Sequence, residues 1–436
     1  MTLFALYRAL GTAATPLARR HLKRRCARGR EDPARLDERL GHAGYARPPG
    51  PLVWIHGASV GESLSALPLI ARIRARWPDL GILVTTGTVT SARLMAERLP
   101  PAVIHQYVPV DLPGAVNRFL DHWRPALGLI VESEFWPNLL LEARRRGIEL
   151  TLVNGRVSAR SFATWRRARP IIARLLAQFS LVLAQSDEDA RRLEALGAAR
   201  TLCMGNLKFA APPLEADPAE LARLRARLGA RPRWLAASTH PGEEAQIAVA
   251  HRALATGHPG LLSVIAPRHP HRGAEIAADL AAAGLAVARR GAGEDPDPAT
   301  EIYVADTMGE LGLWYRLGEI VFVGGSLVPK GGQNMVEPAK LGRAVLCGPH
   351  TANFMRVTDE MTRAGALGRV ADGSELAATV GALMSDAAAR RAMIEAGRAY
   401  ATAQAGVLDD IVAALAPLLD RAAQGRFNPA VSSVII

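Results

Sequence analysis

The chain has 436 residues, of which 49% are apolar and 22% are charged, and its net charge is +12. This length exceeds the size at which one hydrophobic core stops growing, so two domains of about 200 residues are expected. The ordinary composition excludes a disordered or fibrous protein. Cys26, Cys203 and Cys347 are widely spaced and odd in number. They argue against a disulfide framework and indicate a reducing compartment.

Residues 1–30 form a basic arm, with eight Lys or Arg and no acidic residue. Arg8 and Arg19 leave only about ten uninterrupted residues, whereas a membrane-spanning helix needs about twenty. The basic residues follow the apolar ones, which is the reverse of a signal peptide. An apolar face next to a basic cluster is typical of a segment that lies on anionic lipid. By charge alone, nucleic-acid binding and a solvated tail remain alternatives.

After about Pro51, short apolar runs alternate with segments of helical spacing. Four runs predict buried strands: LVWIHG (52–57), ILVTTG (82–87), LGLIVES (127–133) and ELTLVNG (149–155). Because the apolar residues are continuous and do not alternate with polar ones, a parallel sheet covered on both faces is favoured. Residues 68–77 have the mixed composition of a covering helix, and SLVLAQS (180–186) precedes another at 187–197.

Residues 210–218 contain three prolines and no periodicity, which predicts a linker. The strand–helix alternation then resumes with WLAAST, LLSVIAPR, EIYVAD, EIVFVGGS and RAVLCGP. The expected fold class is therefore α/β, with two doubly wound Rossmann-like domains that face a cleft. The predicted boundaries are 31–209 for the first domain and 219–436 for the second. Ligands bind at the carboxyl ends of strands in such sheets, so the residues there are the candidates for function.

The first predicted strand leads into HGASVGES, residues 56–63. Glu62 stands where a helix should begin, among free backbone N–H groups. A carboxylate there is either a helix-start residue that the helix dipole stabilises or a catalytic base. Both interpretations of Glu62 remain open at this point.

A later strand ends in VESEFWPN, residues 131–138. Glu132 and Glu134 are two residues apart, so an extended backbone would point both side chains the same way. Each is a candidate functional acid, although one of them could cap the helix that Pro137 begins.

Lys208 is a candidate because of the chain's own usage of basic residues. The sequence has 49 Arg and only four Lys. A lysine beside the predicted linker suggests a need for a compact ammonium group, although a solvated lysine is the simpler interpretation.

In the second half, PRHPHR (267–272) places Arg268, His269 and Arg272 after a buried strand, which suits an anionic ligand. His269 and His271 have no acidic partner at metal-ligand spacing, so a metal site is not predicted. The glycines at 324–325 allow close approach of a ligand to the backbone. Glu337, in KGGQNMVEP, could hold ribose hydroxyls. No Walker motif and no complete G-x-G-x-x-G is present, which argues against an ordinary NTPase or dehydrogenase.

Eleven short stretches occur in a characteristic order: WIHGASVGES, VTTGT, VESEFWPN, VNGRVSARS, NLKF, ASTHPGEE, PRHPHR, DTMGEL, FVGGS, GGQNMVEP and CGPHTANF. Because it has these motifs in this order, the chain resembles the 3-deoxy-D-manno-octulosonic acid (Kdo) transferases. The resemblance extends from the basic arm to about residue 400. These transferases are nucleotide-sugar glycosyltransferases with the two-domain GT-B architecture.

The resemblance implies transfer of Kdo from CMP-Kdo to a lipid A precursor (lipid IVA) at the cytoplasmic face of the inner membrane. The arm would hold the enzyme on the anionic membrane surface, and nucleic acid is not expected as a partner. The first domain would bind the acceptor and the second the donor. The family's general base falls on Glu62, and Glu132 and Lys208 match residues assigned to transition-state support. The implied contacts to the CMP part of the donor are Pro267, Arg268, Met308, Gly309, Glu310, Asn334, Met335, Val336 and Glu337.

A single inverting displacement needs one base and charge stabilisation for the departing phosphate. Glu62 can supply the base, and Arg268, Lys208 and backbone amides can supply the stabilisation, so neither a metal nor a cofactor is expected. One residue departs from the family pattern: Gln333 stands where a histidine is usual. Glutamine keeps a hydrogen-bonding side chain but cannot carry a proton, so an acid–base role at this position is doubtful.

Two other functions are compatible with parts of the sequence. A nucleotide-sugar epimerase of the same architecture would need no lipid acceptor. A non-catalytic protein that binds a membrane or nucleic acid would show salt-sensitive binding and no dependence of turnover on Glu62. The number of Kdo residues transferred depends on the shape of the acceptor side and is left open by the sequence, as is the oligomeric state.

Overall fold

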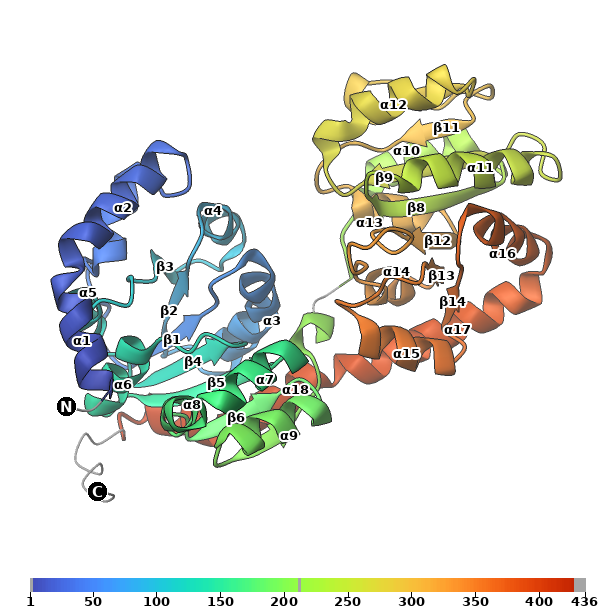
Figure 1. The fold of residues 1–436 in the computed structure, drawn as a ribbon. Coiled ribbons are helices and arrows are strands. Elements are labelled where there is room, and N and C mark those ends of the chain that lie inside the picture. The colour runs from blue at the N-terminus through green and yellow to red at the C-terminus, as the bar shows by residue number, and fades with distance from the viewer. Residues whose placement is uncertain (1–2, 211–212, 427–436) are drawn as a thin grey trace. The chain divides into compact units, whose positions relative to one another are not determined.

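The computed structural model describes residues 3–210 and 213–426. The chain divides into two compact units (Figure 1). Unit 1 comprises Met1–Ala211 and Gln404–Ile436, and unit 2 comprises Pro212–Ala403. Each unit is an α/β domain built on a parallel sheet, which confirms the predicted fold class.

In unit 1 the described residues form a seven-stranded sheet in the order β3-β2-β1-β4-β5-β6-β7. Its strands are β1 (Leu52–His56), β2 (Gly81–Thr86), β3 (Ile104–Tyr107), β4 (Leu127–Val131), β5 (Glu149–Gly155), β6 (Leu181–Ala184) and β7 (Thr201–Cys203). Its helices are α1 (Leu3–Ala13), α2 (Thr15–Ala27), η1 (Pro33–Leu40), α3 (Val60–Arg76), α4 (Val89–Arg98), α5 (Pro113–Trp123), α6 (Pro137–Arg145), α7 (Ala159–Arg167), α8 (Arg169–Leu176), α9 (Asp187–Leu196), η2 (Leu207–Ala210) and α18 (Val407–Ala423).

In unit 2 the sheet order is β10-β11-β9-β8-β12-β13-β14. The strands are β8 (Arg233–Thr239), β9 (Leu262–Pro267), β10 (Val287–Arg289), β11 (Ile302–Val304), β12 (Ile320–Val323), β13 (Ala344–Cys347) and β14 (Leu367–Arg369). The helices are α10 (Pro218–Leu228), α11 (Glu243–Ala255), η3 (Pro270–Arg272), α12 (Gly273–Ala282), η4 (Arg290–Ala292), α13 (Leu311–Leu317), α14 (Val336–Lys340), α15 (Met355–Arg363), α16 (Gly373–Ser385) and α17 (Ala387–Ala405).

Each sheet has a switch point, where the chain changes its direction of winding. In unit 1 this point lies between β1 and β4, which pair directly, and in unit 2 it lies between β8 and β12. Loops that leave neighbouring strands in opposite directions open a crevice at the carboxyl ends. The segments after β1, β4, β8 and β12 are therefore the places where each unit is built to hold a ligand.

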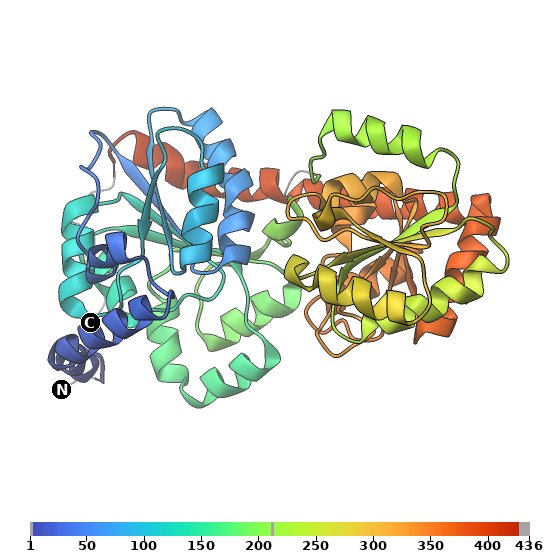
Figure 2. The same cartoon turned by 90° about the horizontal axis from the view of Figure 1, so that it is seen from above.

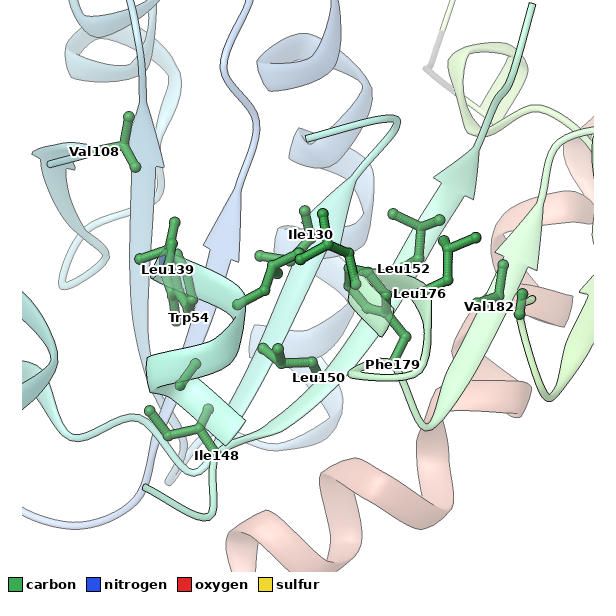
Figure 3. Close-up of a cluster of buried hydrophobic side chains, with 14 of the residues drawn as sticks. Trp54, Val108, Ile130, Leu139, Ile148, Leu150, Leu152, Leu176, Phe179 and Val182 are labelled. Carbon is green, nitrogen blue, oxygen red and sulfur yellow. The ribbon is translucent and has the colours of Figure 1, made fainter. Parts of the chain in front are cut away.

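The strands of unit 1 bury both faces, as their continuous apolar sequences predict. One face carries Trp54, Ile130 and Leu152, which pack against helices α5, α6, α8 and α9 (Figure 3). The opposite face carries Val53, Ile55 and others, which pack against α3, α4 and α18. Figure 2 shows helices on both sides of the sheet in unit 1.

Helix α3 begins at Val60, eight residues before Pro68, the first residue of the segment whose composition predicts a covering helix. Ser59 caps its N-terminus by accepting a hydrogen bond from the Glu62 amide, and Pro68 lies inside the helix. The cap, not the proline, therefore sets where this helix starts.

The N-terminal segment is two helices that belong to unit 1. In α1, Phe4 packs against the core, Tyr7 donates a hydrogen bond to Asp111 (3.0 Å), and Arg8 pairs with the buried Glu142. These contacts fix one face of α1 on the domain, so among the described residues the basic arm is a docked helical segment.

The C-terminal boundary predicted for the second domain is wrong. The continuous assignment of residues 219–436 to it fails because the chain returns to unit 1 at Gln404. Helix α18 buries Ile411, Leu415 and Leu419 against the face of the first sheet that carries Val53 and Ile55. The hydrophobic effect places an amphipathic helix on whichever apolar face is left uncovered, and sequence adjacency does not reveal which one that is.

Within the described residues, Ala387–Ala423 is a helical stretch long and apolar enough to cross a membrane by length and composition. It contains α17 and α18, and 35% of its most apolar window is buried inside the structure. The apolar side of α18 is part of the unit 1 core, which explains the composition of that half of the stretch.

Candidate active site

Glu62 lies in the first turn of α3, just after the carboxyl end of β1. One of its oxygens, Oε2, accepts the backbone N–H groups of Ala58 (2.6 Å) and Ser59 (3.2 Å), and Oε1 accepts the Ser59 hydroxyl (2.8 Å). Together with the Ser59 cap this forms a capping box. The structural interpretation of Glu62 as a helix-start carboxylate is therefore correct, and a role as a base has to be compatible with it.

Burial is the main cause that raises the pKa of Glu62, and the negative charges of Glu132 and Glu134 raise it further. The hydrogen bonds from Ser59 act in the opposite direction but do not cancel this effect. A carboxylate with a raised pKa binds a proton more readily, which is the property required of a general base.

Glu132 and Lys208 come together directly. The Nζ of Lys208 lies 2.6 Å from Oε1 of Glu132, and both side chains are partly buried. A side-chain carbon added at Gly61 would lie 3.9 Å from the Lys208 ammonium, so this ion pair borders the first turn of α3. Three predicted site residues, Glu62, Glu132 and Lys208, thus meet at one edge of the unit 1 sheet.

The backbone around this cluster is strained. Glu132 and Asn154 follow β4 and end β5 with φ values of 63° and 57°, which non-glycine residues rarely adopt. The Oδ1 of Asn154 accepts the backbone N–H of Leu207 (2.9 Å), which fixes the short helix that carries Lys208. The sequence analysis did not single out Asn154. Its position in the Asn-Gly pair that ends the predicted strand 149–155 was the signal that could have identified it.

Glu134, the second acid of VESEFWPN, is held by its neighbours. Its Oε2 accepts the indole N–H of Trp136 (2.5 Å) and lies 3.9 Å from Nε2 of the fully buried His56. Burial raises the pKa of Glu134, but the interactions with His56 and Trp136 outweigh it and hold that pKa below its usual value. The pKa values of Glu134 and Glu62 are thus shifted in opposite directions, so the two carboxylates suit different tasks.

A cavity of about 580 Å³ adjoins the cluster at the carboxyl ends of β4 and β5. It is lined by Glu132, Ser133, Glu134, Phe135, Trp136, Arg156, Val157, Ser158, Ser161 and Trp165. Its volume lies in the range of small-ligand sites.

In unit 2, the buried Glu243 organises the ends of two strands. Its carboxylate accepts the backbone N–H groups of His240 (2.9 Å), Gly325 (2.7 Å), Ser326 (3.0 Å) and Leu327 (2.9 Å). It therefore ties the loop after β8 to the Gly324–Gly325 loop after β12. Sequence reasoning did not single out Glu243, because a glutamate in the first turn of a helix carries no sign of what its oxygens accept.

Arg268 and Pro267 stand at the end of β9. The Pro267 ring is buried, and the Arg268 side chain is exposed and makes no hydrogen bond or ion pair within residues 3–210 and 213–426. It is therefore available to an anionic ligand. Arg272, expected to act beside it, is not: its guanidinium pairs with the nearly buried Glu244 (2.9 Å), because a buried carboxylate needs a compensating charge.

Asn334 and Glu337 contact each other, with the Asn334 amide donating to Glu337 Oε1 (3.1 Å). Burial raises the pKa of Glu337, while Asn334, Lys340 and Arg268 counteract this. Between them, Met335 and Val336 are 0% and 1% exposed. Their side chains belong to the interior, so a ligand would meet only their backbone.

Gln333 lies near His240, with their side-chain nitrogens 3.3 Å apart. Both are close to the φ-positive Gly325. Burial is the main cause that lowers the pKa of His240, and electrostatic interactions with His269, Lys330 and Arg268 lower it further.

The predicted residues Met308, Gly309 and Glu310 lie between β11 and α13. Met308 is 80% exposed and Gly309 has a φ of 82°. The Glu310 carboxylate is engaged by Arg290 at 2.7 and 3.0 Å and by the hydroxyl of Thr307. Arg290 lowers the pKa of Glu310. Met308 and Gly309 are therefore exposed to a ligand, whereas the Glu310 carboxylate is already bound by Arg290 and Thr307.

The predicted residues therefore fall into two groups. Glu62, Glu132 and Lys208 form one cluster in unit 1, whereas the predicted CMP contacts line the carboxyl edge of β9, β11 and β12 in unit 2. Within the described residues there is no group of three or more His, Cys, Asp or Glu placed to hold a metal ion.

The two units are doubly wound α/β domains, and each carries polar residues at the switch point of its sheet. The same fold occurs in a UDP-GlcNAc 2-epimerase from Neisseria meningitidis, solved with UDP-GlcNAc bound. That structure aligns with a TM-score of 0.58 at 13% identity and covers 84% of this chain and 100% of its own. At this identity the likeness concerns the fold alone.

Sequence relatives give the specific assignment. Residues 34–211 match the family model of 3-deoxy-D-manno-octulosonic-acid transferase (kdotransferase). The 3-deoxy-D-manno-octulosonic acid transferase of Bordetella pertussis is 40% identical over 386 residues, which is 84% of this chain and 88% of the relative. That of Haemophilus influenzae is 35% identical over 394 residues, with 89% and 92% covered. The chain belongs to the Kdo transferase family and is a glycosyltransferase, so the epimerase and non-catalytic alternatives are wrong.

Proposed function

We propose that this enzyme transfers Kdo from CMP-Kdo to a sugar hydroxyl of a lipid A precursor (lipid IVA), with Glu62 as the general base. The observation that carries the proposal is the cluster in unit 1. A carboxylate of raised pKa stands there beside a carboxylate–ammonium pair at the switch point of the sheet.

In the proposed reaction the acceptor hydroxyl oxygen attacks the anomeric carbon of Kdo. Glu62 takes the hydroxyl proton, and the bond from the anomeric carbon to the phosphate oxygen breaks, so that CMP leaves with the electron pair. The Ser59 hydroxyl is a rotatable donor, so Oε1 of Glu62 can exchange it for the acceptor hydroxyl without breaking the two backbone bonds at Oε2.

Lys208 would support the developing charge, and Glu132 would hold it in place. The 2.6 Å ion pair fixes the ammonium group beside the first turn of α3. A preorganised charge stabilises a transition state without having to reorganise during the reaction.

The donor is assigned to unit 2. The exposed guanidinium of Arg268 suits the phosphate, and the Asn334–Glu337 pair suits the ribose hydroxyls. The Gly324–Gly325 loop is buried, and a side chain at Gly324 would collide with the Ser238 carbonyl and the Glu243 carboxylate, so its glycines serve packing and not ligand approach.

We also propose that α1 and α2 hold the enzyme on the cytoplasmic face of the inner membrane. Leu3, Leu6, Leu10 and Leu17 are 43% to 71% exposed and recur at helical spacing, while the docked side of α1 faces the domain. Most of the basic residues of α2 are exposed beside them. Apolar insertion together with attraction to anionic lipid headgroups gives stable surface binding.

The test is a transfer assay with CMP-Kdo and a tetraacylated lipid A precursor, with products identified by mass. Glu62→Gln keeps an oxygen for the capping box but removes the base, so we expect turnover to fall by about a thousandfold. Glu97→Gln, an exposed glutamate on α4, is the matched control and should leave the rate unchanged.

An active Glu62→Gln variant would disprove the role of Glu62 as base. If the folded wild-type enzyme gave no product, the donor or the acceptor would be wrong. The mass of the wild-type product also gives the number of Kdo units added.

A further inference from the structure

Asn154 stands at a strained position where β5 ends. Its φ is 57°, it is 1% exposed, and the register between β5 and β6 shifts at this point, between Val153 and Gly155. Glycine adopts a positive φ at no steric cost, whereas other residues rarely adopt it. The backbone would therefore be served equally well by glycine, and what asparagine adds at this position is its carboxamide.

The carboxamide reaches the segment that carries Lys208. Its Oδ1 accepts the backbone N–H of Leu207 (2.9 Å), which is 53 residues further along the chain and comes directly before Lys208. The Leu207 side chain is fully buried in the core cluster that also contains residues of α3 and α18. The start of η2 is therefore held at two points, by the backbone of Leu207 on Asn154 and by the side chain of Leu207 in the core.

The same end of β5 also holds Glu132. The backbone N–H of Glu132 donates to the carbonyl oxygen of Val153 (2.9 Å), the residue before Asn154. Glu132 and Lys208, whose charged groups lie 2.6 Å apart, thus belong to segments that are tied to two consecutive residues of β5. A lysine ammonium has a flexible stem, so the place where its backbone is anchored limits where the charge can stand.

The bond to Leu207 is the one hydrogen bond that the Asn154 side chain makes within residues 3–210 and 213–426. Its Nδ2 is buried and has no hydrogen-bond partner among these residues. Loss of the carboxamide would leave the N–H of Leu207 as a buried donor without an acceptor, which is unfavourable because the donor has lost its water. The start of η2 would then have to move, and Lys208 with it.

We propose that Asn154 is a positioning residue for the transfer reaction. It anchors η2 to the end of β5, so that the Lys208 ammonium stands in its pair with Glu132 beside the first turn of α3. Because Asn154 is buried, it acts through Lys208 and not by contact with a substrate. The proposal rests on the role that we propose for Lys208 in the transfer, and it deepens that role by naming the group that sets the position of the ammonium.

Two variants of the full-length enzyme separate the carboxamide from the backbone. Asn154→Gly keeps the left-handed conformation and removes the acceptor. We expect its kcat to fall by about a hundredfold, the scale of a misplacement of a catalytic group by about 1 Å. The KM for CMP-Kdo should be unchanged, because the donor is assigned to unit 2. Asn154→Asp keeps an oxygen that can accept the N–H of Leu207, so it should restore most of the rate.

Gln106→Ala is the matched control. Gln106 is a fully buried carboxamide on β3, at the edge of the same sheet. Its Oε1 accepts one hydrogen bond, from the Trp123 indole (2.8 Å), and its nitrogen has no partner within the described part of the chain. Its loss removes a comparable hydrogen bond away from Lys208, so kcat should remain at the wild-type value. A cooperative thermal transition like that of Gln106→Ala shows that Asn154→Gly is folded.

The position of the ammonium is measured by NMR, because the chain has only four lysines: Lys23, Lys208, Lys330 and Lys340. In protein labelled with 13C-lysine, Lys208→Arg identifies the Lys208 side-chain signal, and Glu132→Gln gives the position of that signal when the pair is broken. Asn154→Gly should move the Lys208 signal toward that position and leave the other three lysine signals in place. Asn154→Asp should keep the signal closer to its wild-type position than Asn154→Gly does.

If wild-type enzyme transfers Kdo and Asn154→Gly is as fast as Gln106→Ala, or its Lys208 signal does not move, Asn154 is not a positioning residue although the reaction stands. An Asn154→Asp enzyme no faster than Asn154→Gly would overturn the role of the hydrogen bond to Leu207. If wild-type enzyme transfers nothing, the proposed reaction fails. The Lys208 signal then decides alone: a shift in Asn154→Gly supports the anchoring of the ammonium, and an unmoved signal overturns it.

Discussion

At the scale of single residues, Glu62 caps a helix and is also the carboxylate that we propose as the general base. Its Oε2 completes the capping box of α3 through the N–H groups of Ala58 and Ser59. The same position brings it within the field of Glu132 and Glu134, which raise its pKa in addition to burial. The cap fixes the orientation of the carboxylate, and the surroundings set its basicity.

The pH dependence of the rate follows from this pKa. A general base must be deprotonated to act, so the rate falls as the pH drops through the pKa of Glu62, and the raised pKa moves this acid limb upward. Ser59 opposes the rise through its hydrogen bonds. Ser59→Ala removes the hydroxyl bond, so we expect the acid limb of kcat/KM to move to higher pH.

The control for this variant is Thr88→Ala, which removes the same kind of cap from α4. Both substitutions should cost about 1 kcal/mol of stability. Only Ser59→Ala should shift the limb, because Thr88 does not hydrogen-bond Glu62. Identical pH profiles for the two variants would show that Glu62 is not the group that titrates in the rate.

The residue scale also shows what the sequence left out. The spacing of VESEFWPN correctly drew attention to Glu132 and Glu134, because strand ends are where such sheets bind ligands. It did not reveal that Asn154 fixes the helix of Lys208, or that Glu243 gathers four backbone N–H groups. Except for His240, these partners are far apart in sequence, so only the folded chain brings them together.

At the scale of elements, α1 has one side docked on the domain and another side with exposed leucines. Its docked side uses Phe4, Tyr7 and Arg8, while Leu3 and Leu10 remain 55% and 60% exposed. In the membrane binding that we propose, these exposed leucines would insert into the lipid headgroup layer while the other side of α1 stays docked on the domain.

We expect Leu10→Glu to weaken binding to vesicles that contain anionic lipid, because it places a negative charge on the inserting face. Sedimentation with vesicles measures the bound fraction. Val249→Glu is the control, since Val249 is 49% exposed on α11 in unit 2 and should leave the bound fraction unchanged. Equal binding of Leu10→Glu and wild type would show that α1 does not contact the membrane.

At the scale of the whole molecule, the path of the chain makes the two units unequal. Unit 2 is continuous, whereas unit 1 needs α18 from the end of the chain to cover one face of its sheet. Each fully buried leucine of α18 contributes roughly 1.5–3 kcal/mol relative to exposure, so unit 1 loses much of its stability without the helix.

Dissection of the chain tests this dependence. A fragment of residues 213–403 should unfold cooperatively on heating when followed by circular dichroism, because its core lies within it. A fragment of residues 3–210 should bind a hydrophobic dye and show no cooperative transition. Joining residues 404–426 to it through a flexible linker should restore the transition, and failure to do so would show that α18 is not the missing part of the core.

The sequence by itself determined the fold class, the positions of most strands along the chain and the family. Continuous apolar runs are a local signal of buried parallel strands, and the eleven motifs preserve their order along the chain. Strands β3, β7, β10 and β14 escaped prediction. Each is an edge strand of its sheet, so it lacks the long continuous apolar run of a central strand that is buried on both faces.

The tertiary structure alone decided which domain α18 completes and that Arg272 is neutralised by Glu244. It also decided that Glu132, Lys208 and the cavity beside them form one site. Each of these facts depends on contacts between residues distant in sequence. Burial and charge act through space, and a linear pattern records them only where neighbours in the fold are also neighbours in the chain.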